Sequence, residues 1–328
     1  MNEPIEKIAV LTSGGDAPGM NAAIRAVVRA CNYYSIECVG VYRGYQGLID
    51  GDFETISARN VSNIVNKGGT ILKSARSLEF KTKEGRAKAY KNLKAKGIGA
   101  LVLIGGDGTF TGGLKFIEEY NFPLVGIPGT IDNDIYGTDN TIGYDTALNT
   151  VVEVIDKIRD TASSHNRLFF IEVMGRDAGF IALNSGIGAG AEEILIPEKN
   201  LGLEKLVESL NKGRDNGKTS SIVVVSEGDK IGKSVFELAD HITENFPDYD
   251  IRVSVLGHMQ RGGSPSCFDR VLASRLGVAA VEALLDKSTG VMIGITENKI
   301  SKVELDKAIK MNNDINEELL KVAEITSA

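Results

Sequence analysis

The stretch Leu124-Val125-Gly126-Ile127-Pro128-Gly129-Thr130-Ile131-Asp132-Asn133-Asp134 joins a short apolar run to a Pro-Gly turn and then to two acids two residues apart. The apolar run predicts a buried strand that ends at the turn. Open α/β sheets bind their ligands beyond the carboxyl ends of the strands. One carboxylate could then accept a proton from a hydroxyl while the other helps to hold a cation. Alternatively, the stretch is an Asx-rich turn that caps a helix beginning near Ile142.

Strand-like and helix-like segments alternate through the chain. The sequence predicts strands at 8–11, 39–42, 100–104, 124–127, 168–173, 194–196, 222–225 and 253–256, and helices at 20–33, 86–96, 114–120 and 144–158. Such alternation predicts an α/β protein with mostly parallel sheets and helices on both faces. The sequence predicts a division into two α/β layers that meet near Thr141, with the chain crossing back around Gly257.

Composition narrows the class of protein. The chain has 328 residues and a net charge of −7, which argues against a nucleic-acid surface. We see no signal peptide and no apolar run near 18 residues, so we expect a cytoplasmic protein that does not enter a membrane. The three cysteines, Cys31, Cys38 and Cys267, are odd in number and lack the spacing of a metal site, which suits a reducing cytoplasm. The three histidines, His165, His241 and His258, are scattered, so we do not expect a histidine metal site.

Two glycine-rich segments resemble nucleotide motifs. In Ser13–Asn21 the glycines are spaced as at the start of a P-loop, but Met20-Asn21 stand where Lys-Ser/Thr would be needed. The segment therefore predicts a glycine turn at a helix N-terminus, where backbone amides can meet phosphate, or else a plain strand-to-helix connection. Gly186–Ala191 matches the dinucleotide pattern with a final alanine, but it precedes a predicted strand, so we reject it.

A third glycine turn, Gly105-Gly106-Asp107-Gly108-Thr109, follows the predicted strand at 100–104. Glycines let the backbone approach a polyphosphate, and an acid between them suits Mg²⁺ that bridges phosphate oxygens. The same turn also occurs at ordinary strand ends. With Asp132 one strand later, however, two acids converge on one sheet edge. Metal-assisted phosphoryl transfer needs this combination of a cation on the phosphates and a base on the acceptor hydroxyl.

Taken together, these motifs resemble those of the ATP-dependent 6-phosphofructokinases of the bacterial type (phosphofructokinase family A). The matching segments are 11–21, 68–76, 104–109, 128–134, 173–176 and 255–264, in order along nearly the whole chain. The resemblance implies transfer of the γ-phosphate of ATP to the 1-hydroxyl of fructose 6-phosphate with Mg²⁺, giving fructose 1,6-bisphosphate and ADP in glycolysis. It also implies a homotetramer with active sites shared between subunits.

The family's architecture implies two Rossmann-like domains, each with three α/β/α layers. The larger, ATP-binding domain would comprise residues 1–141 plus 257–310. The smaller, fructose-6-phosphate-binding domain would comprise residues 142–256 plus 311–328.

The resemblance also implies roles for single residues. Asp132 matches the general base, Asp107 the Mg²⁺-associated acid with Asp134 as helper, and Arg176 the arginine that stabilises the transferring phosphoryl group. Arg76 is assigned to both catalysis and nucleotide binding, and Thr130 orients the sugar. The nucleotide cradle would be Gly15, Tyr45, Arg76, Ser77, Gly106, Asp107, Gly108 and Thr109. The sugar phosphate would contact Thr130, Ile131, Asp132, Met174, Gly175, Arg176, Glu227, His258, Met259, Gln260 and Arg261, with Arg167 and Arg252 from a neighbouring subunit.

An effector pocket for ADP or phosphoenolpyruvate is implied at Arg25, Arg29, Arg59, Arg159, Gly190, Glu192 and Lys218. Ala58 stands where an arginine is usual, and Asn216 replaces a lysine. Fewer cations should weaken anion binding, so we expect a blunted or altered effector response. Lys73 also departs from the small residue often found before Ser-Ala-Arg, and the sequence offers no explanation for it.

Three rival functions remain open from the sequence. NAD and lipid kinases share the Gly-Gly-Asp-Gly-Thr turn, but they do not account for the Asp132 turn or the cluster at 258–261. Relatives that use pyrophosphate have Asp and Lys at the positions of Gly108 and Gly129, so glycine at both favours ATP. A non-catalytic nucleotide-binding module gives no reason for Asp107, Asp132 and Arg176 to occur together.

Overall fold

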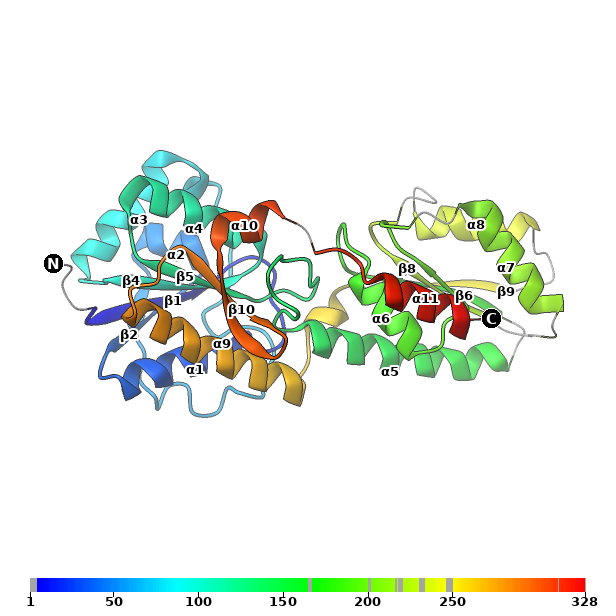
Figure 1. Cartoon of the computed structure of the whole chain (residues 1–328), viewed down its shortest axis with the longest axis horizontal. Helices are drawn as coiled ribbons and strands as arrows, with labels where there is room; N and C mark the ends of the chain where they lie inside the picture. The colour runs from blue at the N-terminus through cyan, green and yellow to red at the C-terminus, as the bar shows by residue number, and fades with distance from the viewer. Residues whose placement is uncertain are drawn as a thin grey trace. The chain divides into compact units, whose positions relative to one another are not determined.

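The computed structural model describes residues 5–164, 167–199, 202–215, 217, 221–229, 234–245, 250–311 and 313–327 (Figure 1). The chain forms two compact units: unit 1 comprises 1–130, 135–146 and 261–313, and unit 2 comprises 131–134, 147–260 and 314–328. The domain boundaries expected from the resemblance lie a few residues before these positions. The segment 131–134, expected in the larger domain, belongs to unit 2.

Unit 1 is built on a seven-stranded sheet in the order β11-β10-β5-β4-β1-β2-β3. The edge pairs β2·β3 and β10·β11 are antiparallel and the remaining pairs are parallel. The central strands are almost entirely buried, which explains why they read as continuous apolar runs. The strands are β1 Lys7–Thr12, β2 Glu37–Val41, β3 Phe53–Thr55, β4 Ala100–Gly105, β5 Leu124–Pro128, β10 Val291–Thr296 and β11 Lys299–Glu304.

Helices cover both faces of this sheet (Figure 1). On one face, α1 (Met20–Tyr33) and α9 (Cys267–Leu285) pack closely, since a Cβ at Gly277 would lie 2.5 Å from the Ala26 Cβ. The other face carries an aromatic core that includes Tyr45, Phe80 and Phe116. The helices on that face are α2 Gly44–Asp50, η1 Glu79–Lys81, α3 Lys83–Ala95, α4 Asp107–Tyr120 and α10 Leu305–Lys310.

Unit 2 holds a four-stranded parallel sheet in the order β7-β8-β6-β9. Its strands are β6 Arg167–Val173, β7 Glu193–Leu195, β8 Ser221–Ser226 and β9 Asp250–Val255. Apolar side chains of α7 (Leu203–Asp215) and α8 (Val235–Asn245) pack on one face. The unit also contains α6 Phe180–Gly188, α11 Glu317–Thr326, most of α5 Tyr144–Ser163 and of the short helix η2 Gly257–Arg261.

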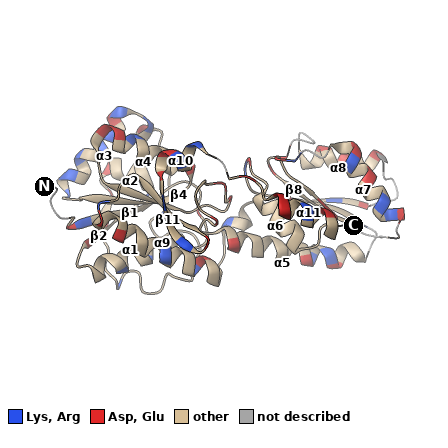
Figure 2. Cartoon of the chain, in the orientation of Figure 1, with Lys and Arg blue, Asp and Glu red and all other residues tan. Residues whose placement is uncertain are grey.

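The predicted fold class, α/β with mostly parallel sheets and helices on both faces, is confirmed. The sequence analysis missed β3, β10, β11, α2, α9, α10 and α11, and it began α4 at Leu114 instead of Asp107. Glycines at 108, 112 and 113 weakened the helical pattern, although Gly113 is required because a Cβ there would lie 2.5 Å from Leu103 Cδ1. In the part of the chain that the structure describes, no helix is long and apolar enough to cross a membrane. Figure 2 shows acidic and basic residues interspersed on both units.

Candidate active site

The carboxyl ends of β1, β4 and β5 are adjacent in unit 1, and two backbone hydrogen bonds join the loops that follow them. The Ser13 N–H donates to the Ile104 carbonyl at 3.0 Å, and the Gly129 N–H donates to the Gly105 carbonyl at 3.0 Å. A Cβ on Gly106 would lie 3.7 Å from the Thr130 Cβ. The three loops predicted from the sequence therefore meet at one sheet edge.

Helix α4 begins at this edge with Gly106 as its N-cap and Asp107 as its first residue. The N–H groups at a helix N-terminus attract anions. The hydroxyl of Thr109 is buried, and among the described residues its Oγ1 has no hydrogen-bond partner. A Cβ on Gly14, in the loop after β1, would lie 3.6 Å from that Oγ1. A phosphate oxygen here would meet both backbone amides and an available hydroxyl.

Gly15 lies beneath the guanidinium group of Arg261. A Cβ at residue 15 would stand 2.6 Å from Arg261 Nη1, and this nitrogen donates to the Asp16 carbonyl at 3.3 Å. Arg261 was expected with the sugar phosphate, but it belongs to unit 1 and lies against the glycine turn. Any side chain larger than glycine at position 15 would displace this cation.

Tyr45 supports α4 from beneath instead of presenting its hydroxyl at the surface. The side chain is buried, its hydroxyl donates to the Thr109 carbonyl, and its ring stacks on Phe80 with centroids 4.0 Å apart. Burial raises the pKa of the Tyr45 phenol well above its ordinary value. Ser77 accepts from the Phe80 N–H at 3.1 Å and so holds its own loop, whereas Arg76 is exposed.

The two glycines that bear on the phosphoryl donor differ in their surroundings. Gly108 is exposed, and a Cβ there would meet nothing within 4 Å. A Cβ on Gly129 would lie 3.1 Å from Ile104 Cγ2 and 3.3 Å from Met20 Cε. Space is therefore open at Gly108, while a lysine at position 129 would require its neighbours to move.

The predicted base and its neighbours belong to unit 2. Asp132 is 8% exposed, and Asn133 holds a left-handed φ of 54°. Asp107 lies in unit 1, whereas Asp132 and Asp134 lie in unit 2, beside the two buried residues Ile131 and Asn133. Within the described residues, no three His, Cys, Asp or Glu side chains cluster as a metal site. One carboxylate with phosphate oxygens is, however, a common way to bind Mg²⁺.

The carboxyl edge of the unit 2 sheet gathers most of the predicted sugar-phosphate residues. The Met174 N–H donates to Gln260 Oε1 at 3.1 Å, and the Arg176 N–H donates to Glu227 Oε1 at 2.7 Å. Arg176 has a left-handed φ of 56°, and Gly175 has a φ of 142° that a larger residue would strain to adopt. His258 and Met259, which follow β9, are exposed. Backbone donors thus fix the conformation of this edge.

Arg167 and Arg252 lie near the opposite, amino edge of the same sheet. Both contact the Asp250 carboxylate, Arg167 Nε at 2.9 Å and Arg252 Nη2 at 2.8 Å. Strand β6 has seven residues and spans about 20 Å, so one sugar phosphate cannot reach both edges. Within one chain, these arginines are not brought together with Arg176. The sequence analysis missed Asp250, and its position two residues before Arg252 was the available signal.

The predicted effector residues fall into two groups. In unit 1, Arg25 and Arg29 lie on α1; Arg25 Nε is buried and has no partner among the described residues, and Arg59 is exposed. Burial and the nearby Arg29 lower the pKa of Arg25. In unit 2, Arg159 donates to the carbonyls of Ala189 and Gly190, and Glu192 accepts from the Ile222 N–H. Lys218 and Asn216 lie outside the described residues.

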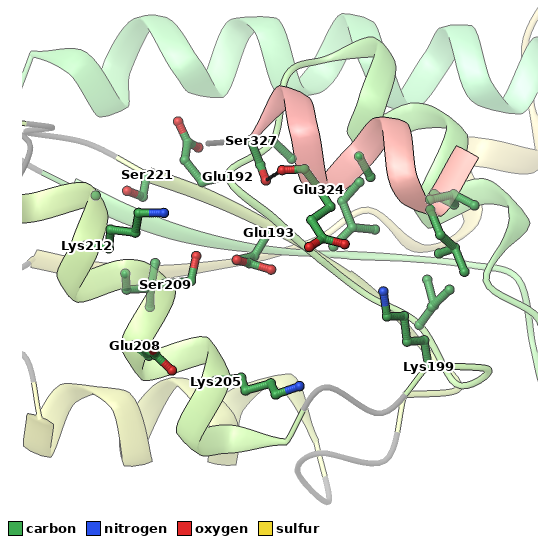
Figure 3. A pocket seen from close by; sticks show the side chains of 18 residues that line it. Glu192, Glu193, Lys199, Lys205, Glu208, Ser209, Lys212, Ser221, Glu324 and Ser327 are labelled. Carbon is green, nitrogen blue, oxygen red and sulfur yellow. Dashed lines mark hydrogen bonds between the residues drawn. The ribbon is translucent and has the colours of Figure 1, made fainter. Parts of the chain in front are cut away.

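Glu192 also lines a pocket of about 430 Å³ in unit 2 (Figure 3). The pocket lies between β7, α7 and α11, with Glu193 and Ser209 inside and Lys199 at its rim. Burial raises the pKa of Glu193 above its ordinary value, and the nearby Glu324 adds to this effect.

Comparisons with known proteins agree with one another. A family model described as phosphofructokinase matches residues 7–284. The chain is 54% identical to "ATP-dependent 6-phosphofructokinase 2" of Bacteroides thetaiotaomicron, over 97% of both chains. It is 55% identical to "ATP-dependent 6-phosphofructokinase 1" of Thermus thermophilus, over 98% of this chain and 99% of the relative.

Solved structures give the same result for the fold. A phosphofructokinase structure from Saccharomyces cerevisiae matches with a TM-score of 0.87 at 38% identity, over 98% of this chain and 47% of the yeast chain, so this chain spans about half of the yeast one. A pyrophosphate-dependent phosphofructokinase from Marinobacter aquaeolei matches with a TM-score of 0.83 at 22% identity, over 99% of this chain and 92% of the other. The second match bears on the fold alone.

Proposed function

The chain belongs to the phosphofructokinase family, and from this premise we propose that it transfers the γ-phosphate of ATP to the 1-hydroxyl of fructose 6-phosphate. The products are fructose 1,6-bisphosphate and ADP. The observation that carries this proposal is the similarity over nearly the full chain to relatives named ATP-dependent 6-phosphofructokinase. The open space at Gly108 supports ATP as the donor, because an acidic side chain there would crowd and repel the adenylyl end of ATP.

Asp132 accepts the proton of the 1-hydroxyl as that oxygen attacks the γ-phosphorus. The bond between this phosphorus and the β,γ-bridging oxygen breaks, and ADP leaves. Arg176 and Arg76 stabilise charge on the transferring group, and Thr130 orients the sugar. General bases contribute about 10²- to 10⁴-fold to such rates.

On the donor side, the turns around Gly15 and Gly106–Thr109 hold the phosphates. Asp107, with Asp134 as a less direct helper, would hold Mg²⁺ together with phosphate oxygens. When bound, Mg²⁺ neutralises charge on the donor's phosphates. The Thr109 hydroxyl, buried without an internal partner among the described residues, supports this use of the loop.

The sugar phosphate contacts both edges of the unit 2 sheet, but from two different chains. Met174, Glu227 and His258 of one subunit bind the sugar with Arg176, and Arg167 and Arg252 of a neighbouring subunit bind the 6-phosphate. The separation of about 20 Å along β6 supports this sharing, since a single chain cannot supply both sets. A cytoplasmic homotetramer with shared active sites accommodates this arrangement.

Effector control is expected to be weak. Within unit 2, Arg159 is already held by two backbone carbonyls and lies 3.6 Å from Glu192. Ala58 and Asn216 stand where relatives usually have an arginine and a lysine, so the effector pocket lacks two cations that would bind an anionic effector. A strong shift of the fructose 6-phosphate saturation curve on addition of ADP or phosphoenolpyruvate would contradict this expectation.

The decisive experiment is a coupled assay of fructose 6-phosphate phosphorylation, with ATP and then with pyrophosphate as donor. We expect turnover with ATP and little with pyrophosphate. The Asp132→Asn variant keeps the side-chain shape but cannot accept the proton, so kcat should fall about 10²- to 10⁴-fold. An Asp132→Asn enzyme as active as the parent would refute the assigned base, and turnover with pyrophosphate alone would refute the donor.

A further inference from the structure

Lys73 has a backbone conformation that few side chains adopt. Its φ is 58°, in the left-handed region where the Cβ of an L-residue approaches the following carbonyl oxygen. Several other non-glycine residues with positive φ stand where the chain turns after a regular element. Asn121 caps the end of α4, Lys287 follows α9, and Glu297 with Asn298 form the turn between β10 and β11.

Two more of these residues, Asn133 and Arg176, lie among the candidate active-site residues. Arg43 stands in the turn between β2 and α2 as the N-cap of α2, and it forms ion pairs with Asp50 and Asp52. Lys73 is neither a helix cap nor a hairpin residue; it ends a turn in which its N–H donates to the Thr70 carbonyl at 3.1 Å. Residues with a strained backbone of this kind cluster at functional sites, where the surrounding structure holds them in place.

The loop that carries Lys73 is held against the carboxyl end of β1. Thr12, the last residue of β1 and fully buried, donates its hydroxyl to the Lys73 carbonyl at 2.9 Å and lies 2.8 Å from the Thr70 hydroxyl. The Arg43 N–H donates to the Leu72 carbonyl at 2.8 Å. The same β1 end continues directly into the Ser13–Gly15 turn. The strained backbone is therefore fixed beside the predicted nucleotide turn.

The side chain of Lys73 is exposed, and Arg76 is exposed three residues later. A glycine at position 73 would adopt the left-handed conformation without strain. Lysine instead adds a positive charge at this rim, in a protein whose net charge of −7 would otherwise repel a polyanion.

We propose that Lys73 strengthens binding of the nucleotide's polyphosphate, so that it sets the affinity for the phosphoryl donor without taking part in the chemistry. This inference rests on the nucleotide site of the proposed function. Because the ammonium is exposed, its effect is modest and salt-dependent, about threefold to fivefold in affinity at low ionic strength.

The test compares Lys73→Gly with Lys287→Gly, whose lysine has a similar φ of 61°, is exposed, and follows α9. Both substitutions replace a lysine in the left-handed backbone conformation with glycine, which adopts that conformation without strain. Both should therefore raise the thermal unfolding midpoint. Only Lys73→Gly should raise the KM for ATP, about threefold to fivefold at low salt and less at 0.5 M salt, with kcat unchanged. Lys73→Arg keeps the charge and should retain the parental KM, whereas Lys73→Asn should behave like Lys73→Gly.

An unchanged KM in both Lys73→Gly and Lys73→Asn, or an equal rise in Lys287→Gly, would overturn the proposal. Binding of ATP measured by calorimetry separates this result from failure of the proposed function. If the parent binds ATP but does not phosphorylate fructose 6-phosphate, the proposed function fails, and the affinities of the variants still decide the role of Lys73.

Discussion

The two edges of the unit 2 sheet hold their polar groups in different ways. At the carboxyl edge, the backbone N–H groups of Met174 and Arg176 donate to Gln260 and Glu227. At the amino edge, Arg167 and Arg252 contact the Asp250 carboxylate through ion pairs whose side chains are 24%, 54% and 38% exposed. The first edge is fixed by the backbone, and the second is held by side chains that water reaches.

This difference suits two different tasks. Groups that stabilise a transition state act best when they are held in place before reaction, and the carboxyl edge fixes the backbone that carries the exposed Arg176 side chain. Exposed ion pairs contribute little to stability, so the carboxylate of Asp250 can give way to a phosphate at little cost. The amino edge is therefore suited to exchanging an internal acid for a ligand's phosphate.

Removing the cation of the carboxyl edge tests the comparison most severely. Arg176→Ala should lower kcat by about 10³-fold or more, because a cation on the transferring phosphoryl group has this weight in related chemistry. Steady-state kinetics with both substrates measures the effect. Asp177→Ala, which removes the exposed partner 3.5 Å from Arg176, is the matched control and should leave kcat nearly unchanged. An equal loss of kcat in both variants would mean that the conformation of the loop, and not the charge of Arg176, determines the rate.

Arg252→Ala should act on binding instead of turnover. Loss of a charge-assisted bond to phosphate should raise the KM for fructose 6-phosphate about 10- to 100-fold, with a much smaller change in kcat.

Hybrid enzymes refolded from mixed Arg176→Ala and Arg252→Ala subunits then sharpen the comparison. If the two edges come from different subunits, some hybrid sites contain both intact edges, and activity exceeds that of either variant alone. No recovery in hybrids of confirmed mixed composition would argue against sharing.

The smallest effect concerns the acids of the carboxyl edge. Burial, and then the nearby Glu227, raise the pKa of Glu172 above its ordinary value of 4.5. The folded state then binds this proton more tightly than the unfolded chain, so the free energy of unfolding decreases as pH rises through the raised pKa. Glu172→Gln should remove this decrease and stabilise the protein at neutral pH by less than about 1 kcal/mol. Denaturant unfolding at several pH values measures it, and a variant less stable at neutral pH would contradict the sign.

The sequence predicted the glycine turns and their sheet edge in unit 1 because those features are local. Each turn follows an apolar run directly, and parallel neighbours end at one edge. The aromatic support from Tyr45 was not predictable, because Phe80 and Thr109 come from distant segments. The antiparallel strands β10 and β11 lie beyond the last strand that the sequence predicted, and they follow one another without a helix between them, so they were missed.

By itself, the sequence determined the alternating α/β architecture, the glycine-rich turns and the acids that follow them. Only the tertiary structure decided which residues share an edge. Arg167 and Arg176 are near neighbours in sequence, yet strand β6 runs between them and carries them toward opposite ends of the sheet. Asp250 joins Arg167 to Arg252 because β6 and β9 pair in parallel register, which no local pattern specifies. Local sequence sets the conformation of a turn, whereas strand pairing and direction set the groups that it faces.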